Sequence, residues 1–439
     1  MAKCTTRRRD LPRAPRPGGR RGAALFLTVL AVSTLLAMTG YMLIAVQRGD
    51  RQLQNNLVRI SGARWCARAG IELALLYMER VPTWRQQVSG DTLLSDVPVG
   101  AGRVTVRVFD DSDGSITDDP LDSVRLVSVG KREACEYCHE ARLVPRSHPA
   151  LKYALFQSGG GEMEFKGHAV ARGPVRSHAR IRGASGVGLR DDASFETMTG
   201  YEIESPLTPQ SFSASALSAP AVDLSAYLAM ATPITGSYGS RCELKGYNLT
   251  PSNNPTGAAN PYGIYALDAG GREVLCENLH VRGTLVIYGT GDKNVTFRKG
   301  LWLEPGPLKY PVLMVNSPLN EMVVHPDNMS FSELSISVVI GLNGLNVSLG
   351  LGCDFNEDGD VLDSITTQVR GIVWTNANRV FLENGSWPFI GCLISSGERV
   401  TVDNDVTVDN DLTLLDTLIP GFTQDGMSIV AGSYREVAP

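Results

Sequence analysis

Sequence signatures of common enzyme classes are missing from this chain of 439 residues. The patterns G-x-S-x-G, H-E-x-x-H and G-x-x-x-x-G-K-[ST] do not occur, so the chain has no nucleophile elbow, zincin helix or P-loop of the usual form. Cysteines are few, eight in all. Outside a reducing cytosol they can form disulfides, but at this density disulfides would only supplement the core. The sequence therefore favours a protein that is not an enzyme.

Charge is absent from residues 22–46, a mostly apolar run behind an arginine-rich N-terminus. About 20 apolar residues in a helix span the roughly 30 Å core of a bilayer. A secretory signal has a shorter apolar region, about 7–15 residues, and a small-residue cleavage site, and no clear A-x-A pattern closes this run. The pair Arg20-Arg21 abuts the run without the residues that flank a twin-arginine signal. We therefore expect a retained transmembrane helix over residues 23–46.

The charges on either side of this run predict its orientation. Residues 1–22 carry eight basic side chains and one acidic side chain, Asp10, a net of +7. The whole chain is at −5, which leaves −12 (−5 − 7) for the remainder. Because basic flanks stay in the cytoplasm, we expect residues 1–22 to be a cytoplasmic leader of a single-pass inner-membrane protein whose bulk is extracytoplasmic. The acidic exterior argues against nucleic acid as a partner.

An amphipathic pattern continues beyond the apolar run, over residues 47–82. Its apolar residues recur at the spacing of one helical face: Leu53, Leu57, Ile60, Ala67, Ile71, Leu75 and Met78. Pro82 ends the pattern. The sequence thus predicts one helix from about Ala23 to Val81, in which Gly62 and Gly70 are weak points that cost roughly 1 kcal/mol each against alanine.

Two stretches of this helix resemble a known family. The likeness is to the minor pilins of the PilX type and to the minor pseudopilin K of type II secretion. It rests on two segments, RGAAL at the junction 21–25 and ARWCARAGIELAL at 63–75. The resemblance implies that prepilin peptidase cuts after Gly22, that Ala23 becomes the N-terminus, and that the helix packs with other pilin-like subunits. Major pilins carry glutamate as the fifth residue after the cut. Leu27 stands there in this chain, which fits a minor subunit better and leaves a plain, uncut single-pass anchor as the alternative.

Residues 83–148 are expected to form a small α+β, pilin-like region. The segments 102–110 and 123–129 alternate valine or leucine with polar residues, as half-buried strands do. They predict a hairpin whose long loop is acidic, with Asp111, Asp113, Asp118 and Asp119. Calcium could bind there, but the irregular spacing favours a solvated turn.

Residues 149–439 have the texture of short strands separated by glycine or asparagine turns, as at 162–183, 279–289, 294–306 and 399–415. The text VTVDND occurs at 400–405 and again at 406–411, and LTLLD follows in register. Stacked coils of this kind favour a β-solenoid, with a β-sandwich as the alternative. Residues 200–270, rich in Ser, Pro, Gly and Asn, are expected to be loops or an insertion. The stretches PALKYALFQSGG at 149–160, residues 370–405 and LIPGF at 418–422 also resemble the β-helical exteriors of some PilX-like proteins. The fold is therefore expected to be mainly β behind a long helix.

The best candidate metal site is a loop that alternates oxygen-bearing residues. Positions 1, 3, 5 and 7 of a calcium-binding loop are matched by Asp354, Asn356, Asp358 and Asp360, and the sixth by Gly359. The bidentate acid of position 12 is missing, because Ile365 stands there, and Asp363 can substitute from position 10. The sequence predicts structural Ca²⁺ at this loop, and the alternative is a solvated acidic turn.

A second motif, Cys135-x-x-Cys138-His139, matches the attachment signature of c-type haem. A single copy in a strand-rich region, without an evident second haem ligand, argues against haem. We expect a short-loop disulfide, a zinc site with His139, or free thiols instead.

These observations favour a non-catalytic minor pilin-like or pseudopilin-like subunit of a type IV pilus or type II secretion-type filament. The alternative is a membrane-tethered β-solenoid adhesin or polysaccharide-active enzyme. Such enzymes use paired carboxylates on one solenoid face, for which the candidates are Asp403, Asp405, Asp409 and Asp411. Acids at strand corners are more often solvated turn residues, so the first hypothesis is preferred.

Overall fold

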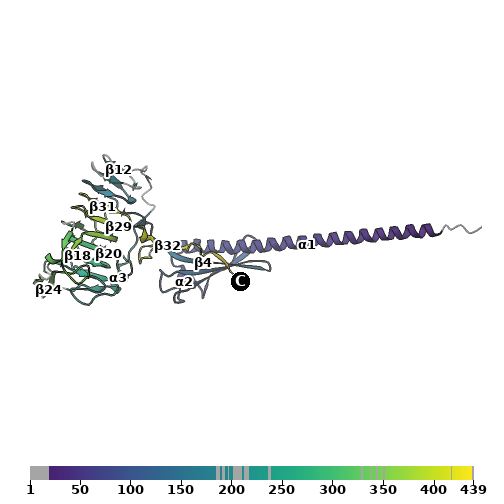
Figure 1. The fold of residues 1–439 in the computed structure, drawn as a ribbon, viewed down its shortest axis with the longest axis horizontal. Helices are drawn as coiled ribbons and strands as arrows, with labels where there is room; N and C mark the ends of the chain where they lie inside the picture. Colours follow the sequence, from purple (N-terminus) through teal and green to yellow (C-terminus); the bar gives the residue numbers. More distant parts are fainter. Residues whose placement is uncertain are drawn as a thin grey trace, which may run out of the picture.

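The protein is mainly β behind one long N-terminal helix, as the sequence predicts. In this computed structural model the described residues are 19–183, 188–189, 193–195, 197–200, 210–211, 217–235, 239–327, 330–336, 338–342, 345–349, 352–416 and 418–437. Helix α1 (Gly19–Arg80) projects far beyond the β-rich remainder (Figure 1). Its bounds confirm the predicted helix, and the first 18 residues of the basic leader lie outside the described part. Helix α2 (Trp84–Gln87) follows Pro82.

The two halves of α1 differ in what covers them. From Ala24 to Ser61 the helix has no cover apart from partial shielding at Gly40 and Arg59. From residue 63 onward one face is buried against a small sheet, and its buried residues are Ala63, Cys66, Ala67, Gly70, Ile71, Ala74 and Met78. The change falls where leucines give way to alanines on this face, because small side chains let a helix approach a sheet closely.

The small sheet is antiparallel and lies against the second half of α1. Its strands are β1 (Thr92–Val99), β2 (Gly102–Asp110), β3 (Val124–Arg132), β4 (Cys135–Ser147), β32 (Thr423–Ile429) and β33 (Arg435–Val437). The register of β2 with β3 confirms the predicted hairpin. Alternate valines of β2, namely Val104, Val106 and Val108, share a core with Ile71 and Met78 of α1, as the period of a strand requires.

The C-terminus completes this sheet. Strands β32 and β33 both pair with β4, on the side opposite to β3. The prediction that residues 149–439 form one exterior region is therefore wrong for residues 423–437. The intervening chain is an insertion between two neighbouring strands of the small sheet, and such long-range pairing leaves no local signal in the sequence.

Glycines let the helix and the small sheet approach closely. A Cβ on Gly130 of β3 would overlap the backbone of Ala63 and Ala67 in α1, and a Cβ on Gly70 would overlap Ser128 and Val104. Gly70, which the sequence indicates as a weak point of the helix, is thus a contact point with the sheet.

The exterior strands pair mainly in parallel, in three rows. The first row runs through β14 (Thr232–Pro233), β17 (Ile264–Asp268), β19 (Thr284–Tyr288), β21 (Leu313–Val315), β27 (Gln368–Thr375), β29 (Pro388–Ser395), β5 (Leu155–Gln157), β8 (Val175–Ser177), β11 (Ala193–Phe195) and β13 (Gln210–Ser211).

The second row contains β15 (Arg241–Lys245), β18 (Glu273–Arg282), β20 (Val295–Glu304), β22 (Glu321–His325), β28 (Arg379–Leu382), β30 (Arg399–Val402), β6 (Glu162–Phe165), β9 (Arg180–Gly183) and β12 (Thr197–Gly200). The third contains β16 (Asn248–Leu249), parts of β18, β20, β27 and β29, then β31 (Thr407–Asp409), β7 (Val170–Ala171) and β10 (Gly188–Leu189).

Paired residues within a row commonly lie 20 positions apart. Val380 pairs with Val400, and Leu155 with Val175. The inward-facing side chains of the paired strands form one large core that extends through all three rows. A Cβ on Gly391 would overlap the carbonyl of Gly371 one step away, so glycine at this corner lets successive layers stack closely.

The order of layers in space differs from the order in the chain. The first exterior strands, β5 to β7, pair with the last ones, β29 to β31, while β14 to β21 lie farther along the stack. Figure 1 shows β12 and β24 (Val338–Leu342) at opposite ends. Entry and exit therefore lie together, where η1 (Pro149–Lys152) contacts η4 (Leu412–Asp416).

Three local expectations are wrong, the third only in part. The VTVDND copies do not stack on each other, since β30 pairs with β28 and β6, whereas β31 pairs with β29 and β7. LTLLD is the 3₁₀-helix η4 rather than a strand. Part of the expected loop region 200–270 forms β14 to β17 and the helix α3 (Leu224–Met230), whose buried Tyr227 packs outside the first row. The six-residue spacing of the two VTVDND copies therefore places them on neighbouring sides of one layer, not in successive layers.

Candidate functional site

Several apolar side chains of α1 are solvent-exposed beyond the part of the helix that a bilayer can cover. If residues 24–46 cross the membrane, Leu57 lies 11 residues farther on, about 16 Å along the helix. Leu53, Leu57 and Ile60 are 60%, 57% and 46% exposed. The helix is long and apolar enough to cross a membrane near the N-terminus, but these three side chains need another cover. The predicted processing residues Gly22 and Ala23 lie inside α1.

The predicted calcium loop lies in a second insertion, between β22 and β27. This insertion contains β23 (Ser330–Ser332), the 3₁₀-helix η3 (Glu333–Ser335), β24, β25 (Leu345–Leu349) and β26 (Ser364–Thr366). Strands β23 and β26 pair antiparallel, and Phe331, Phe355 and Ile365 form a small core packed against Trp302 of β20. The loop is thus held between two anchored segments.

Hydrogen bonds within the loop hold its oxygen atoms in a tight curl. The amide of Gly359, a residue with φ of +98°, donates to the Asp354 carboxylate at 2.9 Å. The amides of Asp358 and Asp360 donate to the side chains two residues earlier, at 3.2 and 3.1 Å. The side-chain amide of Asn356 donates to the carboxylates of Asp358 and Asp363, at 3.0 and 2.6 Å. All five predicted ligands therefore belong to one connected loop.

The structure adds a carboxylate that the sequence does not reveal. Oxygen atoms of Glu333, Asp360 and Asp363 lie within 4.8 Å of one another. Glu333 is fully buried, and its Oε1 accepts the Phe355 amide at 2.5 Å and the Asn356 amide at 3.3 Å. Among the residues that the structure describes, neither its buried Oε2 nor the buried Oδ1 of Asp354 has a hydrogen-bond partner. Burial raises the pKa of Glu333, although the amides of Phe355 and Asn356 offset part of this effect.

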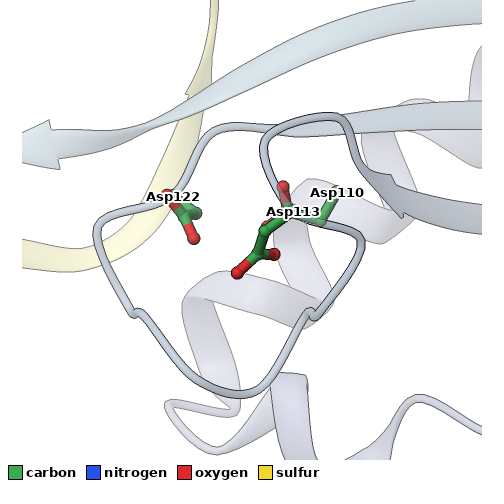
Figure 2. A group of neighbouring side chains, drawn as sticks. All are labelled: Asp110, Asp113 and Asp122. Carbon is green, nitrogen blue, oxygen red and sulfur yellow. The ribbon is translucent and has the colours of Figure 1, made fainter.

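A second acidic cluster lies in the loop between β2 and β3. Figure 2 shows Asp110, Asp113 and Asp122 in this loop, and one oxygen from each lies within 4.8 Å of the others. The sequence predicts an acidic loop from Asp110 to Asp122 and singles out Asp113 within it, but it does not indicate that the two aspartates at the ends of the loop join Asp113. Asp111 instead bonds Arg125 at 3.0 Å. Burial, followed by the charges of Asp110 and other loop acids, raises the pKa of Asp122.

This cluster differs from the first because a positively charged side chain, that of Arg85, already reaches into its loop. The Arg85 guanidinium donates to the carbonyl groups of Ile116 and Asp122, at 2.9 and 2.7 Å. The charge of the nearby carboxylates is therefore balanced in part by a residue of the small-sheet region itself.

The structure does not bring Cys135, Cys138 and His139 into one site. All three lie on β4, where side chains alternate between faces, so the two cysteines, three positions apart, face opposite sides. Burial raises the pKa of the Cys138 thiol. His139 stacks on Tyr434 with ring centroids 5.0 Å apart, and burial lowers its pKa.

Two of the four acids predicted at the last strand corners lie opposite different arginines. Asp409 faces Arg172 at 3.7 Å, and Asp411 faces Arg370 at 4.0 Å. An open hollow of about 320 Å³ includes Asp411, Arg370 and the pair Glu304–Arg282, whose charged atoms are 3.7 Å apart. Arginine thus faces each carboxylate of the hollow, an arrangement that does not supply a free acid and base pair.

Comparison with known protein families and with curated proteins found no match. Among solved structures, the chain is similar to the competence-associated pilin ComZ from Thermus thermophilus, with 12% sequence identity and a TM-score of 0.30. The match covers 86% of this chain and 98% of that chain. A TM-score this low does not establish a shared fold.

Proposed function

We propose that this chain is a non-catalytic minor pilin-like subunit of a type IV pilus or type II secretion-type filament. In this account it belongs with PilX-like minor pilins or the pseudopilin K of type II secretion. Its partners are other pilin-like subunits, which pack against α1, and prepilin peptidase. It is inserted in the inner membrane with its N-terminus in the cytoplasm before it enters a filament.

The single observation that carries the proposal is the uncovered apolar stripe of α1 outside the span of lipid. Burying apolar surface is worth about 25 cal/mol per Å², so bare leucines in water are costly. The charged residues Arg48, Asp50 and Arg51 precede Leu53 on the same helix, which disfavours deeper insertion. A neighbouring helix with a similar stripe would cover Leu53, Leu57 and Ile60 without moving the small sheet.

The exterior, in the same proposal, is a β-solenoid that the small sheet carries as an insertion. Support comes from the three parallel rows and the 20-residue spacing of their partners. A β-sandwich is built from antiparallel sheets, and these rows pair in parallel. Because entry and exit lie together beside β4 and β32, the exterior can decorate a filament without disturbing the packing of α1.

The proposal is tested by the intact mass and N-terminal sequence of the full chain, expressed with and without prepilin peptidase. We expect a peptidase-dependent start at Ala23 despite Leu27. A Gly22→Leu variant should retain its leader under both conditions and serves as the control for the cut site. An uncut leader in wild-type chain made with active peptidase would contradict the proposal and leave a tethered β-protein.

A further inference from the structure

We propose that the loop 354–363 and Glu333 together bind one Ca²⁺ ion, with Glu333 as the acidic ligand that the loop itself lacks. The loop supplies oxygen atoms from Asp354, Asn356, Asp358, Asp360 and Asp363. Glu333 enters from η3, which lies on the other side of β24 and β25 in the sequence. Its position corresponds in role, though not in sequence, to the bidentate acid that closes a calcium loop.

The buried carboxylate is the observation that separates this loop from an ordinary acidic turn. An ionised group buried away from water is costly unless it is paired. Glu333 is fully buried, and its Oε1 accepts two backbone amides. Its Oε2 has no hydrogen-bond partner in the described part of the chain, and the carboxylate lies beside Asp360 and Asp363. Within the described residues, none of the four loop aspartates or Glu333 forms an ion pair with Lys, Arg or His. A divalent cation supplies the missing charge.

The donor set favours Ca²⁺ over other cations. Every candidate ligand is an oxygen, from a carboxylate or an amide, and hard cations prefer oxygen. Five carboxylates and Asn356 can provide the 6–8 oxygen atoms that Ca²⁺ takes, whereas Mg²⁺ demands a near-ideal octahedron and keeps several waters. The amide of Asn356 now donates to Asp358 and Asp363, and a bound cation would have it turn its oxygen inward.

The ion would fasten the insertion to the stack. The Asn248 side chain in β16 donates to the Asp354 carbonyl at 2.6 Å, and its oxygen bonds His280 at 2.8 Å. Thr250 and Ser252 donate to the carboxylate of Glu357 in the same loop. Binding at Glu333 would therefore join η3, the loop and the third row, and it would stabilise the small apolar cluster around Phe355.

The test is calorimetric titration of the purified full chain in detergent, stripped with chelator, using CaCl₂ and in parallel MgCl₂. Wild type should bind Ca²⁺ at least about tenfold tighter than Mg²⁺. Glu333→Gln, which keeps the shape of the side chain, should weaken Ca²⁺ binding at least about tenfold, since removing a supporting partner already costs 10–100-fold. Asp360→Asn changes an exposed residue and should weaken it similarly if Glu333→Gln folds poorly.

Asp113→Asn in the loop between β2 and β3 is the matched control, and it should leave this binding unchanged. The assignment is overturned if wild type binds no Ca²⁺ up to about 10 mM, beyond the weak extracellular range. It is also overturned if Mg²⁺ binds equally well, or if Glu333→Gln and Asp360→Asn both bind like wild type. A loss caused by Asp113→Asn alone would place the ion in the other loop.

Discussion

The two halves of α1 share one helix but have opposite surroundings. Up to Ser61 the helix stands bare, with leucines and other large apolar side chains outward. From Ala63 its inner face is alanine-rich, buried, and in contact with β2, β3, β4 and β32. The covered half therefore stabilises the single chain, whereas the bare half gains nothing until lipid or another helix covers it.

One apolar pattern thus lies in two different surroundings within the same chain. The stripe from Leu53 to Met78 is continuous in sequence, yet only its C-terminal part meets a partner within the chain. Side-chain size distinguishes the parts, because Ala63 and Ala67 permit a close sheet while Leu53 and Leu57 leave a ridge. A ridge of this kind packs into the grooves of a neighbouring helix. Substitutions in the two halves, and acid at their boundary, test that division.

Ile71→Ala should produce the largest loss of stability. Ile71 is fully buried between α1 and the small sheet, so truncation leaves a cavity and costs about 3 kcal/mol. The loss should be measured by native-state hydrogen exchange of β2 to β4 in the full chain in detergent. Leu57→Ala in the bare half is the matched control and should change protection by less than about 0.5 kcal/mol. If Ile71→Ala and Leu57→Ala lowered the protection of β2 to β4 equally, the two halves of α1 would not differ in their contribution to stability.

Gly130→Val should separate the sheet from the helix. The new side chain would overlap backbone atoms of Ala63 and Ala67, which cannot move aside as a flexible side chain can, so we expect a cost of about 2 kcal/mol. Faster hydrogen exchange of the backbone amides of residues 63–78 would show this loss of stability. Gly40→Ala, which meets nothing within 4 Å in the bare half, should leave those amides unchanged. Unchanged exchange in Gly130→Val would contradict the close contact.

Leu57→Gln should preserve the fold but reduce assembly. Leu57 touches no cover in the single chain, so stability should stay within about 0.5 kcal/mol of wild type. A polar side chain on the ridge would weaken packing with a neighbouring helix, and the amount of this chain in sheared or purified filaments should fall. Normal incorporation of Leu57→Gln together with Leu53→Gln would show that the stripe is not a packing surface.

Acid should loosen the edge where the covered half begins. A hydrogen bond from Tyr137, followed by one from Arg64 and its charge, lowers the pKa of Glu436 in β33. Because this pKa is below the unfolded value, the contact stabilises above about pH 4.3 and is lost as pH falls through the folded pKa. Protection of β33 in wild type should therefore decrease as the pH is lowered below about 4.3. Glu436→Gln should already have reduced protection at pH 7 and respond less to acid.

Local patterns predicted α1 and the hairpin of β2 and β3, because both have a strong period in short segments. The pairing of β32 and β33 with β4 was not predictable. The alternating sequence pattern of a strand indicates which of its faces is buried, but not which strand it pairs with. The 20-residue repeat was present in GIYAL at 263–267, GTLVI at 283–287, GIVWT at 371–375 and GCLIS at 391–395. The insertion between β22 and β27 interrupts it, and the shorter VTVDND repeat obscured it.

The candidate sites show the same limit. The loop residues from Asp354 to Asp363 were predictable, because calcium-loop spacing is local. Glu333 was not, since it reaches the loop only through the pairing of β23 with β26. The C-x-x-C-H motif matched in sequence, but a β-strand places Cys135 and Cys138 on opposite faces. A motif therefore needs the backbone conformation that its chemistry assumes.

Photo-crosslinking from the bare half of α1 in living cells tests most directly whether this half packs against another subunit. A photoreactive phenylalanine at Leu57 is compared with one at Leu319, an equally apolar and 68% exposed site on the exterior. We expect crosslinks at position 57 to the N-terminal helix of another pilin-like subunit, identified by mass spectrometry, and far fewer at position 319. Crosslinks at position 57 that are no more frequent than at 319, or that reach only lipid, would contradict the account.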